Sequence, residues 1–283
     1  MTERILFDDR KLDSWRELVE ALDQLTTTNW VFRGHDRAEW PLQTSLEREY
    51  GARGSDVEQR LLWQFVRLAP RLLPSHLIPH DNDAAAWLGL IQHYGGPTRL
   101  LDVTRSPYVA LYFAFEAPGG VDRALWVFDH AWCMAECGRI MAENEGRPLD
   151  ETLGRALGAQ AQLVYSLVHR QPYGDRLFSS FKPFTGVFAV DPWKPDSRQS
   201  AQQAMFLCAA NPSLSFVENF RTHKQPTSPP VYRIVLPASL REEVLERLAF
   251  MNVTAATLFP DLGGLARSLR THVVRRPERG DRP

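Results

Sequence analysis

Residues 87–116 read WLGLIQHYGGPTRLLDVTRSPYVALYFAFE, and they predict two buried helices joined by a short polar turn. Apolar residues recur at helical spacing from Ala84 to Tyr94, and the following Gly-Gly-Pro ends that helix. Ser106 and Pro107 are typical of a helix start, and small apolar residues follow them.

The connection itself contains five polar residues within eight positions: Thr98, Arg99, Asp102, Thr104 and Arg105. A simple link between two buried helices does not need so many, so we expect a functional site here. Two interpretations of Arg99 and Asp102 are open at this point. They contact a ligand, or they form a buried ion pair that pins the turn.

Composition limits the classes of function. The chain has 283 residues, 44% of them hydrophobic, and 33 basic residues stand against 34 acidic ones. A net charge of −1 gives no global attraction to nucleic acid or anionic membranes, although a local basic patch is compatible with it. The absence of a long apolar run or an apolar leader predicts a cytoplasmic protein with no membrane partner. Three cysteines predict reduced thiols rather than a disulfide framework.

A second motif lies upstream. Trp30, Val31 and Phe32 predict a short buried strand, and Arg33 and Gly34 follow at its end. Arg33 either pairs with a nearby acid such as Asp36 or Glu39, or contacts an anionic ligand that Gly34 allows to approach closely. We expect Arg33 and the 98–104 turn to share one cleft.

The remaining segments predict one α+β domain over residues 1–270 with helical insertions, and a disordered tail at 271–283. Helices are expected at 14–25 and 55–73, and residues 131–170 look mostly helical. Strands are expected at 123–128, 184–190 and 231–236, and residues 197–208 predict a bend that leads into a buried strand, with Gln202 and Gln203 at its entrance. His76 and His80 have no matching ligand pair elsewhere, so we expect no metal.

Several segments carry a family resemblance: VFRGH at 31–35, QHYGGPTRLLDVT at 92–104, SPYVALYFAFE at 106–116, SAQQAMF at 200–206 and TAATLFPDLGGLA at 254–266. Together they resemble the bacterial FRG domain, which is named for its Phe-Arg-Gly motif. Gly96, Val103 and Ala204 stand where the family commonly has Leu, Trp and Gly.

A shorter resemblance concerns ADP-ribosyltransferases of the Arg-Ser-Glu type. These enzymes place Arg-Gly at the end of the first strand and a Ser-Thr-Ser turn before a helix, and Arg33-Gly34 and Asp102-Val103-Thr104 are similar. The resemblance implies an ADP-ribosyltransferase-like mixed sheet with NAD as substrate. Arg33 would hold phosphate or ribose, Thr104 would orient Arg33 or the ribose, and Tyr108 or Tyr112 would stack on a ring. The implied catalytic set is Arg33, Arg99, Asp102 and Gln203, and the implied dinucleotide-binding set is Arg33, Gly34, His93, Tyr94, Thr98, Thr104, Tyr108 and Tyr112.

The usual glutamate is missing, since Gln202 or Gln203 stands near the start of the late strand. The first hypothesis is therefore an NAD-dependent toxin or effector, in toxin–antitoxin systems or phage defence, in which Asp102 supplies the carboxylate. Its acceptor is a protein or a nucleic acid, and its partner is a cognate antitoxin or regulator. The alternative is a non-catalytic module that binds a nucleotide or nucleic acid through Arg33, Arg37, Arg99 and Arg105. A third hypothesis, hydrolysis by His93 and Asp102, lacks a Ser or Cys nucleophile motif.

Overall fold

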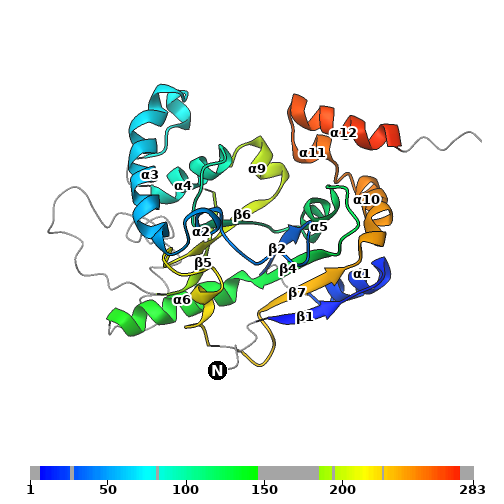
Figure 1. Cartoon of the computed structure of the whole chain (residues 1–283), viewed down its shortest axis with the longest axis horizontal. Helices are drawn as coiled ribbons and strands as arrows, with labels where there is room; N and C mark the ends of the chain where they lie inside the picture. The colour runs from blue at the N-terminus through cyan, green and yellow to red at the C-terminus, as the bar shows by residue number, and fades with distance from the viewer. Residues whose placement is uncertain are drawn as a thin grey trace, which may run out of the picture.

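A seven-stranded mixed sheet organises the chain, and helices cover both of its faces (Figure 1). The computed structural model describes residues 7–25, 29–80, 83–145, 185–192, 195–224 and 226–274. The strand order is β1-β7-β4-β2-β3-β6-β5; only β1 and β7 run parallel, and every other neighbouring pair is antiparallel. The strands are β1 (Asp8–Lys11), β2 (Trp30–His35), β3 (Leu100–Thr104), β4 (Arg123–Asp129), β5 (Val187–Val190), β6 (Ala204–Ala209) and β7 (Val231–Leu236).

Two hydrophobic cores lie on opposite faces of this sheet. One contains Leu62, Trp87 and Cys133, from the helices α3, α4 and α6. The other contains Leu18 and Val244, together with most of α5. The helices are α1 (Trp15–Asp23), α2 (Ser45–Tyr50), α3 (Gly54–Leu68), α4 (Ala84–His93), α5 (Pro107–Phe115), α6 (His130–Glu145), α9 (Ser197–Ala201), α10 (Arg241–Phe250), α11 (Ala255–Leu258) and α12 (Leu262–Val274).

Side-chain caps define the two helices that were predicted around the central connection. The Asp83 carboxylate accepts a hydrogen bond from the Ala86 amide at 3.0 Å and starts α4. The Ser106 hydroxyl accepts a hydrogen bond from the Val109 amide at 3.3 Å and starts α5, and Pro107 lies in the first turn of that helix. Such caps satisfy amides that have no partner within the helix. Both predicted helices are confirmed.

The connection between these helices differs from the prediction. Residues 100–104 form the strand β3 rather than a turn, and β3 pairs along its whole length with β6. Leu100, Leu101 and Val103 are buried, so this short segment has the apolar content of an interior strand, and Asp102 is its exposed residue. The polar residues that were predicted to lie in a turn therefore belong to a strand and its ends.

Strands β2 and β3 are neighbours, but their ladder has a single pair, Phe32 with Thr104. On its other side β2 pairs with β4 through all six of its residues. Beyond the Phe32–Thr104 pair, β2 and β3 therefore separate while each stays bound to its outer neighbour. This separation opens the sheet beside Arg33 and Asp102.

The other expectations have mixed outcomes. The strands expected at 123–128 and 231–236 are confirmed, whereas β1 was not predicted. The helix expected over 131–170 is present as α6 up to Glu145, and the rest of that segment lies outside the described residues, as does the tail from 275. In the described part of the chain, no helix has the length and apolar character needed to cross a bilayer.

Candidate functional site

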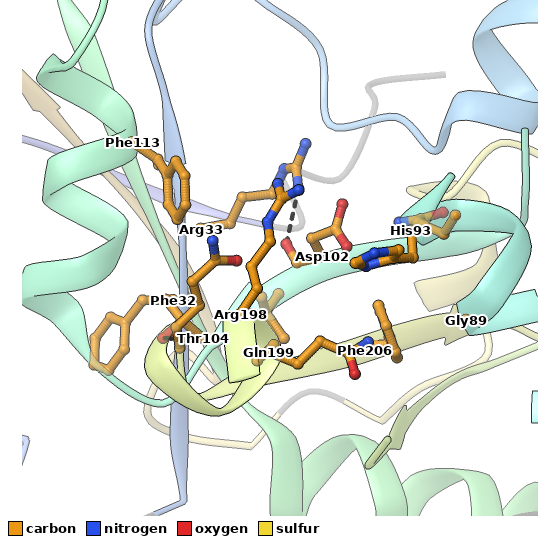
Figure 2. Close-up of a pocket in the computed structure, with 15 residues that line it drawn as sticks. Phe32, Arg33, Gly89, His93, Asp102, Thr104, Phe113, Arg198, Gln199 and Phe206 are labelled. Carbon is orange, nitrogen blue, oxygen red and sulfur yellow. Dashed lines mark hydrogen bonds between the residues drawn. The ribbon is translucent and has the colours of Figure 1, made fainter. Parts of the chain in front are cut away.

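A cleft of about 300 Å³ lies where β2 and β3 separate (Figure 2). The strands β2, β3 and β6 and the helices α4, α5 and α9 all contribute to its walls. Its lining residues are Phe32, Arg33, Gly34, Gly89, Gln92, His93, Asp102, Val103, Thr104, Phe113, Arg198, Gln199, Gln202, Ala204 and Phe206. The prediction that Arg33 and Asp102 share one cleft is confirmed.

Arg33 is held by two hydrogen bonds at the point where the strands separate. Its Nη1 donates to the Asp102 carbonyl at 2.8 Å, drawn as the dashed line in Figure 2, and so satisfies a backbone group that the β2–β3 ladder leaves unpaired. Its Nε donates to Nε2 of His35 at 3.1 Å. Burial and the charge of Arg33 lower the pKa of His35 to about 3, so the ring is a neutral acceptor at physiological pH. The guanidinium is thereby fixed in direction.

Among the described residues, neither Arg33 nor Arg198 has a carboxylate within ion-pair distance. Arg198 comes from α9, and its guanidinium lies 4.8 Å from the centre of the Phe259 ring. Burial lowers the pKa of Arg33, and the nearby charge of Arg48 lowers it further while Asp102 opposes this effect. Among the described residues that line the cleft, Asp102 is the only acidic one. The cleft therefore presents two guanidinium groups that can accept an anion.

The loop and helix that carry Arg198 are ordered by local bonds. Asp196 and Gln199 form a reciprocal capping box at the start of α9, and Asp196 Oδ2 lies 3.3 Å from Nδ1 of His93 across the cleft rim. Helical spacing then puts Arg198 and Gln202 on the same side. The Thr104 hydroxyl donates to the Gln202 carbonyl at 2.7 Å and ties this segment to β3.

Gly34 has a different role from the one expected. A Cβ at this position would lie 2.0 Å from the Ala110 carbonyl and 2.7 Å from the Ala114 amide. The missing side chain therefore allows α5 to pack directly on β2, and Gly34 also lines the cleft. Thr104 likewise orients Gln202 rather than Arg33.

The structure places Arg99 outside the cleft, apart from Arg33 and Asp102. Its Nε donates to a Glu58 carboxylate oxygen at 2.7 Å, its amide donates to the same carboxylate at 3.1 Å, and Nη1 donates to the Ala210 carbonyl. Both side chains are buried. The ion-pair interpretation of Arg99 is thus right, but the partner is Glu58 and not Asp102.

Four other predicted residues also lie away from the cleft. Thr98 is fully buried and bonds to Gln92 and Ser45, so it fixes the approach to β3. Tyr94 is exposed. Tyr108 stacks on Trp15 on the far side of α5, and burial raises the pKa of Tyr112 well above its ordinary value. None of the four is among the residues that line the cleft.

Gln203 also points elsewhere. It has a positive φ of 47°, its carbonyl accepts from the Arg105 amide, and its side chain lines a second cavity with Arg105 and Trp30. Arg105 is paired with Asp191 at 2.6 Å, and Arg37 lies near Glu39. Gln202, the other candidate for the place of the usual glutamate, lines the cleft. Its side-chain amide donates to the Leu258 carbonyl at 3.0 Å.

The sequence reasoning missed Arg198 and Gln199. An Asp-x-x-Gln capping box at 196–199 precedes them, and it could have indicated a helix where a bend was expected. In the described part of the chain, no three His, Cys, Asp or Glu side chains gather as a metal site. Cys133, Cys137 and Cys208 are buried free thiols.

Comparison with known proteins gives a family match. The family model of the FRG domain matches residues 28–122, from just before β2 to the loop before β4. No curated protein and no solved structure matches the chain. Residues 28–122 therefore form an FRG domain, and this domain supplies Arg33, His93, Asp102 and Thr104 to the cleft.

Proposed function

We propose that the cleft binds NAD and that the protein is an ADP-ribosyltransferase-like enzyme. The observation that carries the proposal is the meeting of Arg33, Asp102 and Gln202 in one cleft, from three segments far apart in the chain. Arg33 and Gly34 resemble the Arg-Gly of these enzymes, and Asp102 to Thr104 resemble their Ser-Thr-Ser. The volume of about 300 Å³ is at the lower end for small-molecule sites, so part of the dinucleotide would extend beyond the cleft.

The charges support a phosphate-bearing ligand. Arg33 is oriented by His35 and Asp102, and Arg198 enters from the opposite wall (Figure 2). Two guanidinium groups without carboxylate partners in the described structure fit a diphosphate, because a planar fork can bind phosphate oxygens in pairs. The pair would hold the substrate while the bond between ribose and nicotinamide breaks.

Transfer of ADP-ribose breaks the bond between the ribose C1′ and the nicotinamide nitrogen. The electron pair leaves with neutral nicotinamide, and positive charge develops on the ribose until an acceptor attacks C1′ and loses its proton. A carboxylate near the ribose stabilises that charge. Asp102 is the only acid among the described residues that line the cleft, and its exposed side chain points into the cleft in Figure 2, so we assign this role to it. In this proposal the enzyme is an effector, in a toxin–antitoxin system or in phage defence.

A second candidate is a nucleotide-binding module without turnover. It is favoured by Gln202, which occupies the place where the resemblance calls for glutamate and whose amide is committed to the Leu258 carbonyl. This arrangement binds a ribose or phosphate through Arg33 and Arg198 and leaves the glycosidic bond intact.

The test measures NAD affinity by calorimetry and nicotinamide release by chromatography, with protein, DNA and RNA offered as acceptors. Asp102→Asn keeps the shape and removes the charge, so it should leave the affinity almost unchanged and reduce turnover roughly 100-fold. Asp122→Asn is the matched control, because Asp122 is an exposed aspartate outside the cleft. Binding without nicotinamide release in the wild type supports the binding module. Full turnover by Asp102→Asn removes Asp102 from the mechanism.

A further inference from the structure

The outer surface of α3 carries a row of arginines. Arg60 and Arg67 lie within the helix, Arg53 ends the 3-10 turn before it, and Arg71 ends the 3-10 turn after it. All four are exposed. Successive spacings of seven, seven and four residues return to nearly the same side of a helix, because two turns take about 7.2 residues. We call these four residues the arginine face.

The arginine face lies opposite the side of α3 that packs on the protein. The buried residues of α3 are Gly54, Glu58 and Leu62. At about 100° per residue, Arg60 and Arg67 point roughly half a turn away from them. Figure 1 shows α3 at the outer edge of the molecule, beyond α4. The face is therefore open to a partner.

The four arginines also lack the acidic partners that several other arginines of the protein have. Arg16, Arg139 and Arg247 pair with glutamates on their own helices, and Arg233 pairs with Asp9. In the described structure, no carboxylate lies within 4.0 Å of Arg53, Arg60, Arg67 or Arg71. Glu58, the second acid on α3, is buried against Arg99, which leaves Asp56 as the only exposed acid of the helix. A protein with a net charge of −1 thus concentrates unneutralised positive charge on one helix face.

An aromatic ring lies among these charges. Trp63 is 46% exposed, although a side chain of this size is usually largely buried. The Arg67 guanidinium lies 4.8 Å from the centre of its ring, and the exposed area leaves part of the ring open. An exposed ring between phosphate-binding groups is the arrangement that stacks on a base.

The positive charge continues toward the cleft. Arg48 in α2 is exposed, has no carboxylate partner among the described residues and lies close enough to Arg33 for the two charges to interact. It comes five residues before Arg53 in the chain, so a further unpaired cation near Arg33 precedes the arginine face in the sequence.

We infer that the arginine face, together with Trp63, binds single-stranded nucleic acid. Arginine forks bind phosphate oxygens, and a base stacks on the open part of Trp63. An acidic protein surface would pair with the arginines but would have no base to stack on Trp63. Duplex DNA keeps its bases stacked on one another, so it gains only from the charges. If the proposed NAD chemistry holds, on which this last step rests, we expect the bound strand to be the acceptor.

The test uses fluorescence anisotropy of the full chain, without NAD, on labelled single-stranded RNA and DNA of about 20 nucleotides, longer than a typical single-strand site. The double variant Arg60→Gln/Arg67→Gln should weaken binding at least tenfold and reduce the slope of log affinity against log salt by about 1.4, for two lost phosphate contacts. Arg16→Gln/Arg247→Gln is the matched control, with the same charge change on exposed helices elsewhere. Trp63→Ala should weaken binding and Trp63→Phe should restore most of it.

Three results overturn the inference. They are no binding by the wild type, equal affinity in the double variant and its control, or equal competition by polyglutamate together with no effect of Trp63→Ala. The last result would assign the face to an acidic protein. Because the measurement contains no NAD, its outcome is independent of nicotinamide release, and either proposal can fail without the other.

Discussion

Arg33 and Arg99 come from the two motifs that define the family resemblance, and their surroundings are opposite. Arg99 is 3% exposed, and Glu58 and backbone carbonyls take its hydrogen bonds. Arg33 faces the cleft, bonds to a carbonyl and a neutral histidine, and has no carboxylate partner in the described structure. A guanidinium in a motif is therefore a candidate ligand contact only if no acid neutralises it. Arg99 stabilises the fold through its buried ion pair with Glu58. Arg33 has no acidic partner among the described residues, so its charge is available to a ligand.

The largest effect is expected from removing one side of the buried pair. Arg99→Leu leaves the Glu58 carboxylate buried without its counter-ion, which typically costs about 3 to 5 kcal/mol of unfolding free energy. Urea unfolding measures this loss. The double variant Arg99→Leu/Glu58→Leu removes both charges and should recover a large part of it. A loss below about 1 kcal/mol for Arg99→Leu would mean that the pair is not a structural anchor.

The sequence predicted the elements of the fold better than the partners of its side chains. Apolar periodicity, the Asp83 and Ser106 caps and the Gly-Gly-Pro stop are local signals, and α4 and α5 follow from them. The same signals missed β3, because a five-residue apolar segment between two helices looks like a link until its pairing with β6 is known. The meeting of Arg33 and Asp102 was predictable, since both lie where an apolar pattern ends.

The assignments that failed depend on contacts between distant segments. Glu58 lies 41 residues from Arg99, so nothing local indicates their pairing. Gln202 and Gln203 are adjacent, yet Gln202 lines the cleft while Gln203, which has a positive φ, lines the second cavity. Arg198 and the arginine face were missed although local signals exist for both: a capping box for the first, and a spacing of seven between Arg53, Arg60 and Arg67 for the second.

A smaller effect on stability and a clear effect on binding are expected at Arg33. Arg33→Ala removes two hydrogen bonds at the edge of the cleft, so it should lower the unfolding free energy by only about 1 kcal/mol. It should weaken NAD binding by about 1.5 to 3 kcal/mol, which is more than tenfold, because a charge-assisted contact is lost. Arg33→Lys is the control, because it keeps the positive charge but loses the planar guanidinium fork. Its NAD affinity should lie between that of the wild type and that of Arg33→Ala. Thermal melting and calorimetry would be measured on the same samples. A large loss of stability with unchanged NAD affinity would put Arg33 in the same class as Arg99.

The smallest effects on stability and NAD affinity are expected at two adjacent residues, Gln202 and Gln203. The Gln202 amide lines the cleft and donates to the Leu258 carbonyl, so Gln202→Ala should cost about 1 kcal/mol of stability and weaken NAD binding by a similar amount. Gln203 is exposed and outside the cleft, so Gln203→Ala should be close to neutral in both measurements. Gln203→Gly should stabilise the protein slightly, since glycine adopts a φ of 47° without steric cost. The two alanine variants are matched in chemistry and differ only in the direction of the side chain. If Gln203→Ala weakens NAD binding more than Gln202→Ala does, the ligand lies on the side of the second cavity, and the cleft between Arg33 and Arg198 is not where it binds.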